Sequence, residues 1–349
     1  MGDRVNLRLS VLDQSTIVTG RAPAASIRES IALAQHCEAL GYDRYWCAEH
    51  HNSDSIAGTA PEVLLAAIGA TTKRIRIGSA GIMLPHYSSL KVAEQFRVLD
   101  AIAPGRVDMG LGRAPGSDGR TAYALNPSAD SAAEHFPAQV RDLMAWVAGE
   151  KLVEGHPYRD IVAQPRGESL PETWILGSSD YGAQVAAYFG LPYCFASFIT
   201  DGRGAEQALD VYRQTYRPSE RHPQPHPAVC IWALAADTEE EANYLFRSRE
   251  LARLLRDKGV YAPLYSPAEA AAREYTEGEM LRVQKTRDRT LHGTAKQVGD
   301  GLRAMATSLG VEEIAVLTAV HDPEKRRRSY TLLAEEFGLR AKDTAPAAG

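Results

Sequence analysis

A glycine-rich segment with one arginine, Val107–Asp118, holds the residues best suited to binding an anion. An apolar run leads into it, and Gly110, Gly112 and Gly116 allow the backbone to approach a ligand closely. Arg113 stands among these glycines, and its planar guanidinium can give a phosphate two charge-assisted hydrogen bonds. The dinucleotide pattern G-x-G-x-x-G is not met, because the third glycine comes one residue late. The segment predicts either a phosphate clamp at Arg113 or a glycine turn with a surface arginine.

A second candidate for anion binding is Gly177-Ser178-Ser179-Asp180, which ends an apolar run and starts a helical pattern. Free N–H groups and small hydroxyls at a helix start attract an anion, and the helix dipole adds to this attraction. The alternative is that Ser179 or Asp180 caps the helix, and a cap does not exclude a bound phosphate.

Glu49-His50-His51 allows three interpretations. Adjacent histidines rarely reach one metal ion together, and the sequence has no H-x-x-x-H or H-x-H that would support a metal site. One imidazole could instead act as an acid or base near neutral pH. The third interpretation is a polar loop whose histidines are satisfied by neighbouring groups.

The small residues of Ser79-Ala80-Gly81-Ile82 would let a flat ring lie against the backbone. The alternative is a tight turn from a strand into a loop.

These candidates follow the ends of consecutive strands in a repeating pattern of strand, loop and helix. Eight strands are expected at Leu7–Leu12, Arg44–Ala48, Ile75–Ala80, Val107–Leu111, Trp174–Leu176, Tyr193–Ala196, Val229–Ala236 and Ile314–Leu317. Eight strands alternating with helices are typical of the (β/α)8 TIM barrel, an α/β fold whose ligands bind at the carboxyl ends of the strands. The candidate residues should therefore meet at one mouth.

The helices and loops complete this single-domain barrel, which is expected over residues 1–340. The first helix is expected after an N-cap at Ser26 and ends at Gly41. Residues 257–290 form a long insertion between the seventh and eighth strands and could cover the mouth or move as a lid. Residues 341–349 are small and polar, and we expect a disordered tail there.

The composition excludes several classes of protein. The net charge is −5 and aromatic residues make up 7%, which argues against nucleic acid as a partner. No apolar run reaches membrane length and no signal peptide is recognisable, so we expect a cytoplasmic protein. Four distant cysteines without a C-x-x-C are expected to be buried free thiols. The sequence lacks the G-x-S-x-G and P-loop motifs, so hydrolase and P-loop functions have no support.

Longer motifs resemble the bacterial luciferase-like, flavin-dependent monooxygenases. The similar segments are Trp46–Asn52, Gly78–Pro85, Ala93–Asp100, Pro104–Asp118, Trp174–Ser179 and Leu291–Val298. Their order and spacing match over Leu7–Phe337. The motifs are specific for the family and not for a substrate.

The resemblance implies a TIM barrel that binds reduced FMN (FMNH2) at the strand ends and reacts with O2 through a C4a-hydroperoxide of the flavin. It implies Arg113, Ser178 and Ser179 at the FMN phosphate, Leu176 and Gly177 beside the flavin, and Ala80-Gly81 as a cis peptide under the ring. It also implies His50 and the preceding Glu49 as the catalytic residues. Gly182 stands where bacterial luciferase has a threonine at the phosphate, so Tyr181 or an arginine elsewhere would complete that site.

These residues predict a monooxygenase that oxygenates a small organic substrate. A separate flavin reductase would supply FMNH2, because no second nucleotide-binding motif is present. The alternatives are an F420-dependent hydride-transfer enzyme of the same barrel family and a non-enzymatic flavin-binding barrel. The resemblance also implies a homodimer through helices near the second and third strands. We expect Met83, His86, Tyr123 and Phe198 in the substrate pocket, whose substrate cannot be read from the sequence.

Overall fold

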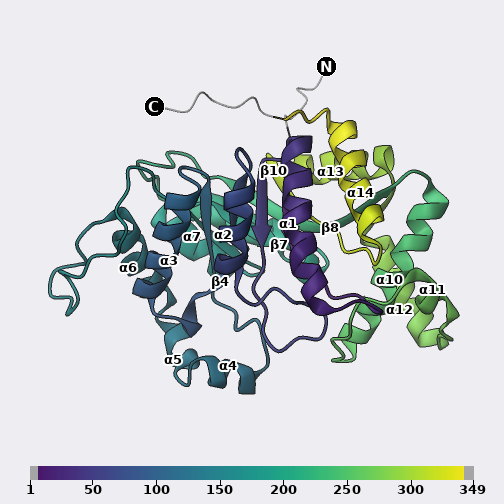
Figure 1. Ribbon diagram of the computed structural model, residues 1–349, viewed down its shortest axis with the longest axis horizontal. Coiled ribbons are helices and arrows are strands. Elements are labelled where there is room, and N and C mark those ends of the chain that lie inside the picture. Colours follow the sequence, from purple (N-terminus) through teal and green to yellow (C-terminus); the bar gives the residue numbers. More distant parts are fainter. Residues whose placement is uncertain (1–6, 342–349) are drawn as a thin grey trace.

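Eight parallel strands close into a barrel in the computed structural model of this protein, which describes residues 7–341 (Figure 1). The ring closes because β10 pairs with both β1 and β8. Its strands are β1 (Arg8–Asp13), β2 (Arg44–Cys47), β3 (Arg76–Ser79), β5 (Val107–Gly112), β6 (Glu172–Gly177), β7 (Tyr193–Ala196), β8 (Pro227–Ala236) and β10 (Glu313–Leu317). The predicted TIM barrel and its eight strands are confirmed.

Helices surround the barrel, as the alternating pattern predicts. They are α1 (Pro23–Leu40), α2 (Pro61–Thr71), α3 (Ser89–Ile102), α6 (Phe136–Ala148), α7 (Asp180–Phe189), α9 (Ala205–Thr215), α13 (Ala295–Leu309) and α14 (Pro323–Phe337). Neighbouring members of this ring pack against each other, α1 on α2 and on α14 among them.

The N-cap expected at Ser26 is wrong, because α1 begins three residues earlier at Pro23. Proline suits the first helical position, since its fixed φ is helical and the N–H that it lacks would have no partner there. Ser26 lies inside the helix, and its hydroxyl donates to the carbonyl of Thr16 at 2.8 Å. The end at Gly41 is confirmed, with a left-handed φ of 91° that favours glycine.

Two short strands were not expected from the sequence. β4 (Ile82–Met83) pairs with the end of β5, and β9 (Leu291–Thr294) pairs with Ala233–Ala236 at the end of β8. β4 has only two residues, and β9, with the sequence Leu-His-Gly-Thr, contains a glycine and a single apolar residue, so neither gives a recognisable strand pattern.

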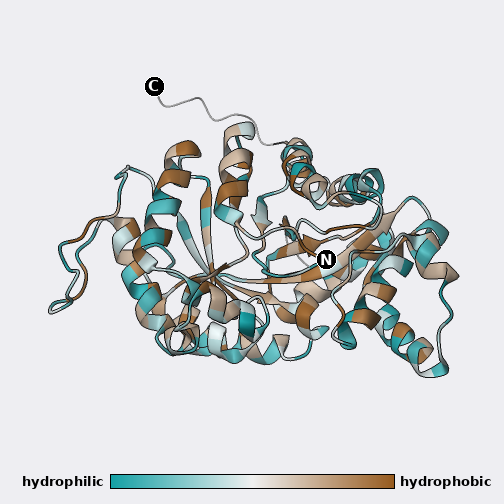
Figure 2. Ribbon diagram, turned by 60° about the horizontal axis from the view of Figure 1, so that its bottom comes forward, coloured by the Kyte–Doolittle hydropathy of each residue, from teal (hydrophilic) through white to brown (hydrophobic). Residues whose placement is uncertain are grey.

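Two apolar layers form the core. Strand side chains alternate between the barrel interior and the surrounding helices. The interior layer includes Trp46 and Trp174, whose ring centres lie 5.0 Å apart in an edge-to-face arrangement. Figure 2 shows the hydrophobic colour concentrated on the strands and the hydrophilic colour on the outer faces of the helices. The four cysteines are buried and free, as expected.

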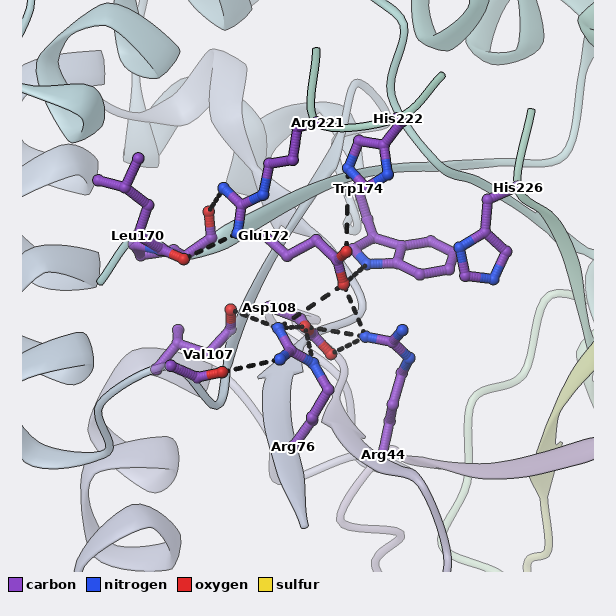
Figure 3. A network of polar contacts seen from close by, with 12 residues as sticks. Arg44, Arg76, Val107, Asp108, Leu170, Glu172, Trp174, Arg221, His222 and His226 are labelled. Atoms are coloured by element: carbon purple, nitrogen blue, oxygen red, sulfur yellow. Dashed lines mark hydrogen bonds and ion pairs between the residues drawn. The ribbon is translucent and has the colours of Figure 1, made fainter. Parts of the chain in front are cut away.

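A buried ion network crosses the barrel at the amino ends of its strands (Figure 3). Arg44 Nη1 donates to Asp108 and to Glu172, and Arg44 Nε donates to Glu313 at 2.8 Å. Arg76 binds the same Asp108 carboxylate from β3. The arginines therefore tie strands from opposite sides of the barrel together, at the end away from the expected ligand site.

Loops, several short helices and the long helix α10 extend from the carboxyl ends of the strands. They are η1 (Leu84–His86), α4 (Gly119–Leu125), α5 (Ala129–Glu134), α8 (Ser197–Thr200), α10 (Glu239–Asp257), α11 (Pro267–Ala272) and α12 (Glu277–Asp288). In Figure 1, α4 and α5 lie at the lower left, and α10, α11 and α12 lie at the right.

The insertion expected at residues 257–290 contains α11 and α12, which both pack on α10. The expected tail, 341–349, lies outside the described residues apart from Ala341. Within residues 7–341, no helix is long and apolar enough to cross a membrane.

Candidate functional site

A cavity of about 670 Å³ opens at the carboxyl ends of the strands. This volume is within the range of small-molecule and cofactor sites. The structure brings nearly all of the predicted site residues into its wall: His50, Ala80, Gly81, Arg113, Leu176, Gly177, Ser178, Ser179 and Tyr181. Glu49 is the exception and lies behind the wall.

Arg113 and the start of α7 form one polar corner of the cavity. The guanidinium carbon of Arg113 lies 4.0 Å from the centre of the Tyr181 ring, a cation–π contact. Ser179 is the N-cap residue of α7 but its side chain makes no capping hydrogen bond, so its hydroxyl and the first N–H groups are open to a ligand. The carboxylate of Asp180 accepts from Gln207 Nε2 at 2.6 Å. Its charge is thereby engaged by α9.

Gly182, the departure from bacterial luciferase, faces Tyr193. A Cβ at this position would lie 3.4 Å from the Tyr193 ring and 3.7 Å from the Cα of Gly177. The Tyr193 hydroxyl donates to the carbonyl of Ser179 at 3.1 Å and so helps to hold the start of α7 in place. A Cβ at position 182 would thus make ordinary van der Waals contacts, and the local packing alone does not require glycine there.

The small residues after β3 form a ledge along the cavity. The Ala80-Gly81 peptide is cis. A Cβ on Gly81 would lie 2.8 Å from the carbonyl carbon of Leu111, and a Cβ on Gly110 would overlap the carbonyl oxygen of Ser79. Only glycine permits the two strands to approach this closely, which leaves flat backbone at the cavity surface.

His50 presents an imidazole to the cavity from the loop after β2. Its Nδ1 is buried without a hydrogen-bond partner in the part of the chain that the structure describes. Burial, and next the positive charge of Arg256, lowers the pKa of His50 to about 4. The imidazole is therefore neutral at pH 7 and can donate or accept one hydrogen bond with a ligand.

Glu49 holds the neighbouring groups in place. It is 1% exposed. Its carboxylate accepts from the Tyr87 hydroxyl at 2.6 Å and from the backbone N–H of Met83 at 3.0 Å, and it lies 2.8 Å from His51 Nε2. The glutamate thus fixes His51 and the start of η1 and has no direct access to the cavity. Among the described residues, no group of three or more His, Cys, Asp or Glu could hold a metal ion.

The expected pocket residues divide between two environments. Met83 and Phe198 line the cavity. The prediction that His86 and Tyr123 line the pocket is wrong, because neither is in the cavity wall. His86 Nε2 binds the carbonyl of Pro115 at 2.8 Å, and Tyr123 is 66% exposed. His86 lies in η1 and Tyr123 in α4, and the strand pattern does not determine the course of these segments beyond β3 and β5.

The insertion contributes to the wall through its first residues. Val260, Tyr261, Ala262 and Leu264 line the cavity, and Leu264 forms a parallel bridge with Val18 of the loop after β1. The first residues of the insertion thus form part of the cavity wall, whereas α11 and α12 pack on α10.

Sequence reasoning missed two arginines of α10 and one tryptophan of β8. Arg249, Arg256 and Trp232 line the cavity. A signal was present, because Arg249, Ala252 and Arg256 follow the spacing of one helix face. That Tyr181 or an arginine elsewhere completes the phosphate site stays a prediction.

The chain belongs to the luciferase-like monooxygenase family, whose model matches residues 7–313. It is 37% identical to a luciferase-like monooxygenase of Escherichia coli K12 over 327 residues, 93% of this chain and 96% of that protein. It is 36% identical to the N-acetyl-S-alkylcysteine monooxygenase of Bacillus subtilis 168 over 334 residues, 94% of this chain and 98% of that protein. The crystal structure of apo-MsnO8 is 35% identical, with a TM-score of 0.85 over 96% of this chain and 99% of that chain. The family supports monooxygenase activity.

Solved structures below 25% identity share the fold alone. One is a type II Baeyer–Villiger monooxygenase from Pseudomonas putida in complex with FMN, 18% identical, with a TM-score of 0.66 over 95% of this chain and 97% of that chain. Another is an F420-dependent secondary alcohol dehydrogenase, 13% identical, with a TM-score of 0.66 over 97% of this chain and 99% of that chain. The barrel is thus common to proteins with either cofactor.

Proposed function

We propose that this protein is an FMNH2-dependent monooxygenase that uses O2 to oxygenate a small organic substrate through a C4a-hydroperoxide of the flavin. The observation that carries the proposal is the shared cavity of Arg113, the start of α7 and His50. The reduced flavin supplies the electrons that activate O2. The residues of the chain bind, orient and enclose it.

Arg113, Ser178 and Ser179 bind the FMN phosphate in this proposal. Arg113 supplies a charged guanidinium group, which is held in place by its cation–π contact with Tyr181. The open N–H groups of α7 and the Ser179 hydroxyl supply the other donors. The phosphate would thus be held between β5 and β6.

Ala80, Gly81, Leu176 and Gly177 lie along the flavin ring in this proposal. The backbone ledge is flat because Gly81 and Gly110 carry no Cβ. Leu176 adds an apolar contact from the neighbouring strand.

His50 exchanges a proton or hydrogen bond with the oxygenated flavin or the substrate. Its Nδ1 has no protein partner in the described residues, and its low pKa keeps the ring neutral at pH 7. Glu49 supports His51 and the loop and acts through position alone. The segment from Val260 to Leu264 keeps water from the site, which an oxygenated flavin requires.

The setting of the enzyme is part of the same proposal. It works in the cytoplasm, receives FMNH2 from a separate reductase and forms a homodimer through α2 and α3. Val63, Val98 and Ile102 on these helices are exposed apolar side chains. Light scattering coupled to size exclusion measures the mass, and a monomer at high protein concentration would contradict the dimer.

The cofactor is tested by titrating the protein with FMN, FAD and F420 and following flavin fluorescence. We expect FMN to bind most tightly and Arg113→Gln to weaken it. Preference for F420, with its blue-shifted spectrum, would replace the proposal with a hydride-transfer oxidoreductase of the same fold.

A further inference from the structure

Two arginines of α10 line the cavity without a hydrogen bond or ion pair among residues 7–341. They are Arg249 and Arg256, and the Nε atom of Arg249 is fully buried and unpartnered. Arg256 has only a distant contact with an aromatic ring, 6.0 Å from the centre of Tyr261. Together with Ala252 they place one face of α10 on the cavity.

The carboxylates around this helix are already occupied by other arginines. Arg253 binds Asp201 at 2.8 Å and Asp257 at 3.4 Å. Glu250 pairs with Arg287. Arg249 and Arg256 are therefore the cations of this face that remain available to a ligand.

The indole N–H of Trp232 is a third donor in the same part of the cavity wall. Trp232 is 5% exposed, and its indole Nε1 is buried without a hydrogen-bond partner in the described residues. The guanidinium carbon of Arg249 lies 5.5 Å from the Trp232 ring centre. A buried donor without a partner costs free energy, so a cluster of such donors indicates a bound acceptor.

The charge of the cavity wall favours an anion. Among the described residues, the wall carries three arginines and one carboxylate, Asp118. Asp118 caps α4 by accepting from the backbone N–H groups of Arg120 and Thr121, on the side of the cavity near Arg113. Burial, and next the charges of Arg253 and Arg256, lowers the pKa of Arg249 to about 10. An anion beside these side chains would favour the charged form of Arg249 and so offset the lowering of its pKa.

We propose that Arg249, Arg256 and Trp232 form a subsite that binds the carboxylate of an organic-acid substrate, an inference that rests on the proposed function and names its substrate class. The guanidinium groups supply charged donors and the indole supplies a neutral one. The subsite follows β8, whereas the phosphate corner follows β5 and β6. Figure 1 shows α10 on the opposite side of the molecule from α4 and α5, which follow Arg113.

The subsite also directs the substrate toward His50. The pKa of His50 is lowered by burial and next by the positive charge of Arg256. Arg256, His50, Phe198 and Leu264 line one cavity, so a carboxylate on Arg256 would leave the carbon skeleton of the acid inside the cavity that His50 also lines.

Isothermal titration calorimetry tests the subsite by comparing the affinities of matched acids and amides. It is carried out both on the FMN-loaded protein and on the protein alone. The probes are hexanoate and 4-phenylbutanoate against hexanamide and 4-phenylbutanamide. We expect at least one acid to bind roughly tenfold more tightly than its amide. Arg249→Gln and Arg256→Gln should each remove most of this difference and leave amide binding unchanged. The control is Arg247→Gln, an exposed position of the same helix, which should keep the difference.

Three results would overturn the subsite. The first is equal binding of acids and amides, or no acid binding at ~10 mM. The second is a tenfold loss of FMN affinity in Arg249→Gln or Arg256→Gln, which would assign the arginines to the cofactor phosphate. The third is a lower unfolding midpoint in Arg249→Gln together with weaker acid binding, which would indicate a structural role. We expect the midpoint to be unchanged or raised, because the variant removes a buried unpaired charge.

The same titrations separate this inference from the proposed function. Acid selectivity in a protein that does not bind FMN would leave the subsite and reject the flavin enzyme. FMN binding without acid selectivity would reject the subsite and leave the proposed flavin enzyme in place.

Discussion

The guanidinium carbon of Arg113 lies 4.0 Å above the centre of the Tyr181 ring, so the arginine that follows β5 contacts α7, the helix that follows β6. This contact keeps an exposed side chain pointing at the start of α7. A corner arranged in this way before a ligand arrives binds a phosphate with less loss of side-chain freedom.

Arg113→Gln should weaken FMN binding by roughly thirtyfold, because it removes the charged donor of the phosphate corner. Tyr181→Leu should give a smaller loss of a few fold, since the arginine remains but is no longer held. Fluorescence titration measures both. Arg120→Gln on exposed α4 is the matched control, and equal losses in the three variants would reject a specific role for Arg113.

Arg256→Gln should raise the pKa of His50 from about 4 toward its ordinary value near 6.5. Removal of a nearby positive charge favours the imidazolium, whereas burial continues to oppose it. NMR titration of His50 in the ligand-free protein measures the shift. An unchanged pKa would show that Arg256 and His50 do not share one electrostatic environment.

Gly110→Ala should lower the unfolding midpoint and reduce flavin binding together. Its Cβ would overlap the carbonyl oxygen of Ser79 and lie 2.6 Å from Leu176 Cδ1, so β3 and β5 must separate under the flavin ledge. Gly119→Ala is the control, because nothing lies within 4 Å of a Cβ there. Normal flavin binding in Gly110→Ala would contradict the ledge.

Arg44→Met should lower the free energy of unfolding by about 3–5 kcal/mol, because Asp108 and Glu313 would remain buried without their main cation. Urea unfolding measures this change. Arg141→Met, on the outer helix α6, should change it little, and a similar loss in both variants would contradict the importance of burial.

The same network predicts acid sensitivity. Burial alone raises the pKa of Glu172, but Arg44 and Arg76 outweigh it and lower the pKa to about 2. Its contribution to stability is therefore complete above pH 4.5 and is lost as the pH falls from 4.5 toward 2. Urea unfolding at several pH values in this window should show a falling midpoint, and Glu172→Gln should flatten the decline. An equal decline in this variant would contradict the assignment.

The sequence predicted the barrel and the residues at its strand ends because both leave local patterns. Buried strands alternate with helices, and Arg113 and Ser179 stand where such strands end. Arg249 and Trp232 could not be placed in the same way, because their meeting depends on how α10 turns back over the barrel. The sequence also did not predict that Glu49 lies behind the cavity wall, because this position depends on contacts with Tyr87 and Met83 from another segment.

The central claim is the reaction of bound FMNH2 with O2, with His50 at the reacting end of the cavity. The direct measurement mixes the protein with FMNH2 without oxygen, adds O2 and follows the absorbance. We predict a transient C4a-hydroperoxide that outlives the one in free solution and decays faster in His50→Ala. Oxidation at the rate of free FMNH2, without an intermediate, would contradict the monooxygenase.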